Sequence, residues 1–284
     1  LVAMPSLSSH RTLLLESFTL FCTIIMPNSY KHAVAQRFSA AASRYDRVAH
    51  LQRLVCDTLI ETMPPSLDAQ QIMDLGAGTG YASTALQQRF PGSQYWAVDL
   101  AEGMLRYMHQ HVAAKAYVCA DMECLPFAPN YFDLIVSSLA VQWSLNFVQS
   151  LEQCYACVRS GGVMQFSTVL EGSLRELKQS WASVDDGPHV NRFRTRNDYL
   201  SLCHQSQWQI IAVEQRRYCY FYDHVKHLRQ ELRDLGANHI HGNLQTHLGA
   251  RRRWQQLIDA YEHYRTSNGL PATWDILYIT LQKP

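Results

Sequence analysis

Residues 72–80 read IMDLGAGTG, and the fold class can be inferred from them. An apolar run carries Asp74 and enters a loop with three alternating glycines. A dinucleotide-binding loop needs the spacing GxGxxG, and this loop has GxGxG instead. The carboxylate of Asp74 would repel a pyrophosphate, so the loop favours a ligand that carries positive charge.

Two further acidic residues end the next two expected strands. Asp99 lies about 20 residues beyond the glycine loop, where a carboxylate can accept both hydroxyls of a ribose. Asp121 ends the following strand, within reach of an adenine amino group. Because such strand ends open into one crevice, the ordered set indicates an S-adenosylmethionine site. The expected cofactor contacts are Asp74, Gly76, Gly78, Gly80, Asp99, Leu100, Asp121, Met122 and Leu139.

Strand and helix patterns alternate around this loop, which indicates an α/β fold with a parallel sheet covered by helices on both faces. After residue 170 the alternation breaks into helical segments and two long strands. With no clear linker, we expect a single domain over residues 26–284, with substrate-side insertions at about 171–206 and 223–268. The expected strands are 71–75, 94–100, 116–120, 134–138, 163–170, 208–222 and 274–282, and 159–162 (RSGG) is an expected turn.

The N-terminal segment, residues 1–25, is expected to lie outside the fold. Its apolar run is interrupted by Glu16 and ended by Pro27, and it is shorter than the roughly 20 residues that span a bilayer. We expect no membrane association, and Met26 would make a natural start.

The composition excludes two broad classes of protein. Of the 284 residues, 47% are hydrophobic and 17% are charged, which is too apolar for a disordered chain. Lys and Arg number 25 against 24 Asp and Glu, for a net charge of +1, whereas a protein that clamps a nucleic-acid backbone is usually far more basic. We expect a cytoplasmic monomer that binds no nucleic acid.

The eight cysteines and thirteen histidines do not form a metal-binding pattern. Only Cys154 and Cys157 make a CxxC, with no second pair to complete a zinc site. We expect reduced, structural thiols and no metal.

Two later segments extend the pattern to a known superfamily. Residues 132–143 read FDLIVSSLAVQW, and 159–162 read RSGG. With the glycine loop and its acidic partners, these make residues 36–170 resemble the class I S-adenosylmethionine-dependent methyltransferases. The resemblance implies a Rossmann-like sheet.

Other segments narrow the resemblance from about residue 30 to the C-terminus. They resemble the malonyl-acyl-carrier-protein O-methyltransferase family of biotin synthesis. The family's loop often reads GCGxG, and here Ala77 replaces the cysteine. The segments are FSAAASRY (38–45), HLQ (50–52), LAVQW (139–143), GSLREL (172–177), PHVNRF (188–193) and GANHIH (236–241).

The resemblance implies methyl transfer from S-adenosylmethionine to the free carboxylate of a malonyl thioester. The methyl ester then starts pimeloyl-chain assembly in biotin biosynthesis. The implied partner is an acyl carrier protein carrying a malonyl group, or malonyl-coenzyme A. Two alternatives stay open: methylation of a quinone precursor or another small carboxylic acid, and a cofactor-binding partner protein without catalysis.

A malonyl carboxylate is ionised at pH 7, so its methylation needs alignment and water exclusion rather than a general base. Arg192 is our candidate for holding that carboxylate, with His189 as a weaker one. Tyr45 is expected to close over the methyl group, and Gln142 and Trp143 to face the cofactor from the end of the fourth strand.

Late in the chain, residues 214–265 hold nine Lys and Arg against six Asp and Glu, a local net of +3. A basic face of this kind suits an acidic carrier protein. We expect one or two of Arg251, Arg252 and Arg253 to contribute to it, joined by Lys226 or Arg229; the alternative is a plain solvated helix.

Overall fold

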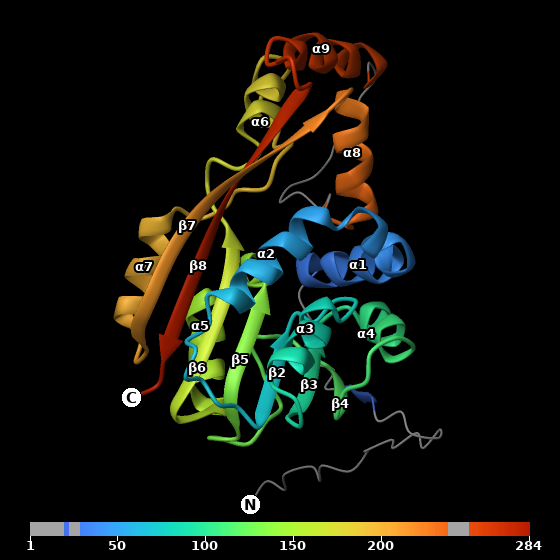
Figure 1. Cartoon of the computed structure of the whole chain (residues 1–284). Helices are drawn as coiled ribbons and strands as arrows, with labels where there is room; N and C mark the ends of the chain where they lie inside the picture. The colour runs from blue at the N-terminus through green and yellow to red at the C-terminus, as the bar shows by residue number, and fades with distance from the viewer. Residues whose placement is uncertain (1–19, 23–28, 238–249) are drawn as a thin grey trace, which may run out of the picture.

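The computed structural model describes residues 20–22, 29–237 and 250–284. Its centre is one eight-stranded sheet with the strand order β1-β4-β3-β2-β5-β6-β8-β7 (Figure 1). The strands from β1 to β6 pair in parallel, and β8 pairs antiparallel with both β6 and β7. In chain order they are β1 (Leu20–Cys22), β2 (Gln71–Leu75), β3 (Gln94–Asp99), β4 (Ala116–Cys119), β5 (Phe132–Ser138), β6 (Val158–Val169), β7 (Gln209–Tyr222) and β8 (Leu270–Gln282).

Helices cover both faces of this sheet, which confirms the predicted α/β class. On one face α2 and α3 bury residues such as Leu59 and Leu86, and on the other α5 and α7 bury Phe147 and Tyr199. The helices are α1 (Ser29–Val48), α2 (His50–Glu61), α3 (Tyr81–Arg89), α4 (Glu102–His109), α5 (Phe147–Cys157), α6 (Arg175–Ala182), α7 (Arg196–Gln205), α8 (Val225–Asp234) and α9 (Ala250–Glu262), with a 3₁₀ turn at Val141–Trp143.

Two local expectations are corrected. The sheet is mixed, because β8 returns antiparallel between β6 and β7. The segment 159–162 is the first part of β6 rather than a separate turn, and the pairing with β5 shifts register there. The glycines in this segment suit a strand that deforms where its register shifts.

The N-terminal expectation also changes in one place. Leu20–Cys22 pairs with β4 as an edge strand, so these three residues join the sheet. The rest of 1–25, and Met26, lie outside the described residues. Among the described residues, no helix is long and apolar enough to cross a membrane.

The late insertions divide between two faces. At the far ends of β7 and β8, α6, α8 and α9 gather around one another (Figure 1). Their apolar side chains, among them Leu177, Leu228 and Leu257, continue the core of the α2 face. Helix α7 packs instead on α5, where Tyr199 meets Phe147 edge to face. The part of 171–206 that contains α7 therefore lies on the other face of the sheet from α6, α8 and α9.

Candidate active site

The glycine loop turns back on the end of β3. The N–H groups of Gly76 and Ala77 both donate to the carbonyl of Val98, at 2.7 and 3.0 Å. Gly76 and Gly78 both have positive φ, at +78° and +55°, where a side chain is strained. A Cβ on Gly76 would collide with Ala140, whereas one on Gly78 would meet no atom within 4 Å. Gly76 thus allows close packing, and Gly78 leaves room for a ligand.

Asp99 lies beside this loop with both carboxylate oxygens turned to backbone donors. Oδ2 accepts from the Gly78 N–H at 2.9 Å and Oδ1 from the Ala101 N–H at 2.7 Å. Burial raises the pKa of this carboxyl, and these backbone hydrogen bonds oppose the rise. The geometry leaves further lone pairs of the carboxylate for ribose hydroxyls.

Asp121 is held by a lysine that the sequence analysis missed. The Nζ of Lys31, near the start of α1, lies 2.6 Å from Asp121 Oδ2 and 2.7 Å from Glu123 Oε2. The pKa of Glu123 lies below its usual value. Burial raises this pKa, but a backbone hydrogen bond from Asn146 and the pair with Lys31 lower it by more. The sequence signal was present, because Lys31 continues the buried stripe of α1 that includes Val34. A lysine on such a stripe needs a buried acidic partner.

Asp74 and Gly80 lie behind the loop, outside the wall of the cofactor cavity. Asp74 is buried and accepts a hydrogen bond from the Ser83 hydroxyl at 2.7 Å, which fixes the first turn of α3. Burial raises the pKa of Asp74 to about 6. A Cβ on Gly80 would press on Met108. These two residues shape the loop and do not line the cavity.

The other expected cofactor residues do line one cavity of about 100 Å³. Helix α1 covers it, tied to the loop by a 2.7 Å hydrogen bond from Thr79 to Asp46. The open space at Gly78 and the carboxylates at two strand ends fit S-adenosylmethionine. The expected residues in the wall are Gly76, Gly78, Asp99, Leu100, Asp121, Met122 and Leu139.

A second, larger cavity of about 600 Å³ adjoins the first. Its wall is mostly apolar and comes largely from α1, α2, α6, α8, α9 and the loop before α7, with further residues from the segment after β5 and from β6 and β8. Four residues belong to both walls and so mark the junction: Phe38, Tyr45, Leu139 and Trp143.

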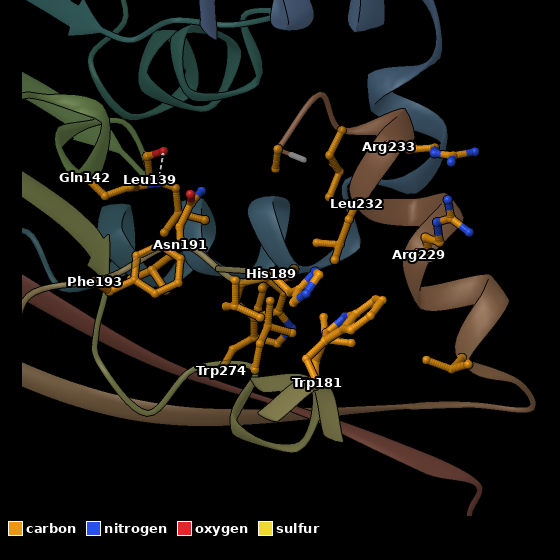
Figure 2. Close-up of a pocket in the computed structure, with 18 of the residues that line it drawn as sticks. Leu139, Gln142, Trp181, His189, Asn191, Phe193, Arg229, Leu232, Arg233 and Trp274 are labelled. Atoms are coloured by element: carbon orange, nitrogen blue, oxygen red, sulfur yellow. Dashed lines mark hydrogen bonds between the residues drawn. The ribbon is translucent and has the colours of Figure 1, made fainter. Parts of the chain in front are cut away.

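The junction is built with some strain. Leu139 has φ +51°, a conformation that costs a non-glycine residue about 1–3 kcal/mol. Its N–H donates to the Ser167 carbonyl, and its own carbonyl accepts from Gln142 Nε2 at 2.6 Å (Figure 2). The ring of Trp143 packs edge to face on Phe38, with centroids 5.3 Å apart. Tyr45, Gln142 and Trp143 are therefore brought together where the two cavities meet.

Burial and the neighbouring carboxylates of Asp46 and Asp99 raise the pKa of Tyr45. Its phenol therefore stays protonated at neutral pH, when it can donate a hydrogen bond but cannot act as a base.

Arg192 is not in the wall of either cavity, and its side chain is exposed. Its neighbours Asn191 and Phe193 face the large cavity instead (Figure 2). In an extended loop, successive side chains point in opposite directions. A shift of one residue along the loop therefore decides which side chain enters the cavity. The arginines in the wall are Arg229, Arg233 and Arg253.

His189 does line the large cavity. Its Nε2 lies 2.6 Å from Asp185 Oδ1, and its ring stacks on Trp181 with centroids 3.7 Å apart. The Asp185 Oδ2 faces Arg253 at 3.6 Å. Burial raises the pKa of Asp185, but His189, Gly187 and Arg253 together lower it below its usual value.

In the described part of the chain, no group of three or more His, Cys, Asp or Glu side chains could hold a metal ion. Cys154 and Cys157 are buried in α5 without a disulfide. Burial raises the pKa of Cys157 to about 11, so it stays a thiol at neutral pH.

Comparisons with known proteins agree with this geometry. A family described as a methyltransferase domain matches residues 73–166. A proposed methyltransferase from Bacillus halodurans has a similar fold, with a TM-score of 0.58 at 13% identity over 81% of this chain and 98% of that one. A geranyl diphosphate methyltransferase solved with SAM gives a TM-score of 0.51 at 14% identity over 82% and 85%. A [4+2]-cyclase, SpnF, is also similar, at 0.52 and 15% over 82% and 81%. The fold alone therefore does not decide the reaction.

Sequence relatives are more specific. The biotin biosynthesis bifunctional protein BioHC of Cellvibrio japonicus is 40% identical over 89% of this chain, and the chain spans about half the length (50%) of that relative. The malonyl-[acyl-carrier protein] O-methyltransferase of Methylococcus capsulatus is 34% identical over 89% of this chain and 94% of its own length. That of Gallionella capsiferriformans is 31% identical over 89% and 91%. With a cofactor cavity, a large cavity that adjoins it and relatives matched almost from end to end, the chain belongs to the malonyl-acyl-carrier-protein O-methyltransferase family.

Proposed function

We propose that this chain transfers a methyl group from S-adenosylmethionine to the free carboxylate of a malonyl thioester carried by an acyl carrier protein, as a step of biotin biosynthesis. The observation that carries the proposal is the shared wall of the two cavities. Phe38, Tyr45, Leu139 and Trp143 line both, so a donor in one cavity and an acceptor in the other meet there. The relatives named for this reaction support the same substrate.

When bound, S-adenosylmethionine supplies a methyl group on a positively charged sulfur. The protein's part is to bind and orient an acceptor that is already ionised, since an ordinary carboxyl has a pKa near 4. The aromatic rings of Phe38 and Trp143 exclude water from the junction, which leaves a weak nucleophile less solvated. The raised pKa of Tyr45 keeps its hydroxyl available as a hydrogen-bond donor.

The acceptor carboxylate is best placed between the neutral side chains of the junction. Asn191 has a buried Oδ1 with no hydrogen-bond partner among the described residues. Rotating that amide by half a turn would present its NH₂ group instead. The second N–H of Gln142 Nε2 is a further donor, because only one is needed for the Leu139 carbonyl. Neutral donors hold an oxyanion without neutralising its charge, so it keeps its nucleophilicity.

The large cavity favours a thioester over a small free acid. A malonyl group alone would leave most of the 600 Å³ empty. An extended, uncharged arm attached to it would fill the apolar part of the wall. This argues against a small carboxylic acid as the acceptor.

A single assay tests the proposal. The purified chain is incubated with S-adenosylmethionine and, in parallel, with malonyl-acyl carrier protein, malonyl-coenzyme A, free malonate and a quinone precursor, and each product is examined by mass spectrometry. We expect a methyl ester on the malonyl thioesters and slow or no reaction with the other two. Preferred methylation of free malonate or of the quinone precursor would overturn it. So would tight cofactor binding without turnover on any acceptor, which would indicate a binding protein.

A further inference from the structure

Two groups of polar residues in the wall of the large cavity lie far apart from each other (Figure 2). Gln142 and Asn191 are at the end next to Leu139, where the cofactor cavity begins (Figure 2). Arg229 and Arg233 are on α8 at the opposite side of the cavity (Figure 2). Between the two ends the wall carries apolar and aromatic side chains such as Leu232 and Trp181, together with His189, which is already paired with Asp185. A ligand that spans the cavity therefore meets neutral donors at one end and cations at the other.

The two arginines are spaced four residues apart, so they lie on the same side of α8. Like charges at this spacing destabilise a helix. Burial and the positive charge of Arg233 lower the pKa of Arg229. Within the described residues, neither guanidinium lies within 4 Å of a carboxylate, although Arg44 and Arg253 nearby both have acidic partners. An anion between them would relieve this repulsion.

The surroundings of Arg229 hold its guanidinium in place. It lies over the ring of Trp254 on α9, 4.5 Å from the ring centroid. A cation stacked on an aromatic face keeps its N–H edge free for hydrogen bonds. The guanidinium group is planar, and its free N–H edge can donate two parallel hydrogen bonds to the oxygens of a phosphate.

We propose that Arg229 and Arg233 bind the phosphate of a phosphopantetheine arm, at the end of the cavity opposite to the methyl-transfer junction. This inference rests on the proposed function, and it names the part of the substrate that the α8 end recognises. The uncharged pantetheine chain would run along the apolar wall, and the malonyl carboxylate would reach the junction. The same phosphate is present on an acyl carrier protein and on coenzyme A, so the subsite serves either source.

The test compares two substrates that differ only in the phosphate. Malonyl-phosphopantetheine and malonyl-pantetheine are each assayed with the unmodified chain and with the double variant Arg229→Gln, Arg233→Gln. We expect the unmodified chain to prefer the phosphorylated substrate by about tenfold or more in kcat/KM, since one charge-assisted hydrogen bond alone is worth about that factor. The double variant should lose this preference through KM while it uses malonyl-pantetheine unchanged.

Arg106→Gln is the matched control, because Arg106 is an exposed arginine of α4 paired with Glu102 and is absent from both cavity walls. It should keep the full preference for phosphate. Calorimetry of S-adenosylmethionine binding shows that each variant is folded.

Three results would overturn the inference, and they differ from one another. If the unmodified chain uses both substrates equally well, the arginines do not bind the phosphate, and the proposed function stands. If the double variant loses activity on both substrates equally, the arginines are structural. If neither substrate is methylated by the unmodified chain, although malonyl-acyl carrier protein is, then the carrier protein itself and not its arm is recognised. Failure with malonyl-acyl carrier protein as well would refute the proposed function.

Discussion

The cofactor cavity and the large cavity are built in different ways. The first is formed mainly by strand ends and the loop after β2, and its key contacts are backbone N–H groups such as those of Gly78 and Ala101. The second is assembled mostly from side chains of α1, α2, α6, α8, α9 and a connecting loop, with a smaller part from the segment after β5 and from β6 and β8. A site made from backbone and strand ends follows from local sequence order, whereas one made from distant helices depends on how those helices pack.

The largest expected effect is the loss of cofactor binding when Asp99 is replaced. In Asp99→Ala two ribose hydroxyls lose a charged acceptor, each worth about 1.5–3 kcal/mol. We expect S-adenosylmethionine binding, measured by calorimetry, to weaken at least about a hundredfold. Asp68→Ala, at an exposed loop position, is the control and should bind normally. An unchanged dissociation constant for Asp99→Ala would remove Asp99 from the site.

The second prediction concerns the carboxyl behind the glycine loop. The folded pKa of Asp74 is about 6, against about 3.9 for an unfolded Asp. The folded chain therefore binds the Asp74 proton more tightly than the unfolded chain does. Protonation of Asp74 makes its whole contribution to the free energy of unfolding below pH 4, and this contribution is lost as the pH rises through 6. The isosteric variant Asp74→Asn has no such loss and can still accept from Ser83. Its advantage in free energy of unfolding over the cofactor-free parent should grow between pH 4 and 6, by at most about 3 kcal/mol.

Urea unfolding of both chains from pH 4 to 8 measures this difference. Parallel stability curves would show that Asp74 titrates normally. That result would not affect the hydrogen bond that Asp74 accepts from Ser83 at the start of α3.

The third prediction compares the neighbouring residues Asn191 and Arg192. Asn191 faces the large cavity, and Arg192 does not. We expect Asn191→Ala to lower kcat/KM for the malonyl substrate about tenfold, by loss of one hydrogen bond to a charged group. Arg192→Ala should change it less than about threefold, with cofactor binding intact in both. The reverse order of effects would restore Arg192 as the residue that holds the carboxylate.

The smallest expected effect concerns the carrier protein. Arg253 belongs to the cavity wall, so only Arg251 and Arg252 remain as exposed candidates at the start of α9. Reversing both to Glu should raise KM for malonyl-acyl carrier protein several-fold and leave malonyl-coenzyme A nearly unchanged. The effect should shrink as salt is added, because exposed charges are screened.

The control is a reversal of two exposed arginines on other helices, Arg89→Glu with Arg106→Glu. An equal change for both substrates, or a carrier-protein KM that does not respond to salt, would indicate that Arg251 and Arg252 only solvate the helix.

Most of the cofactor cavity could be predicted from sequence. The order of strand, glycine loop and acidic strand end predicts it because each contact is local or lies at the same edge of a parallel sheet. The prediction was less accurate for Asp74 and Gly80, since sequence order cannot distinguish a residue that lines a loop from one that supports it. Lys31 was missed because its partners, Asp121 and Glu123, are about ninety residues away.

The α/β class, the place of the glycine loop and the carboxylates that end β3 and β4 could all be predicted from the sequence. These depend on hydrophobic periodicity and on the turns that only certain residues allow. Only tertiary packing settled that Asn191 rather than Arg192 enters the large cavity, and that α7 packs on α5 while α8 brings two arginines to the cavity. The direction of a loop side chain and the face of a packed helix depend on contacts among segments far apart in the chain, which local sequence does not encode.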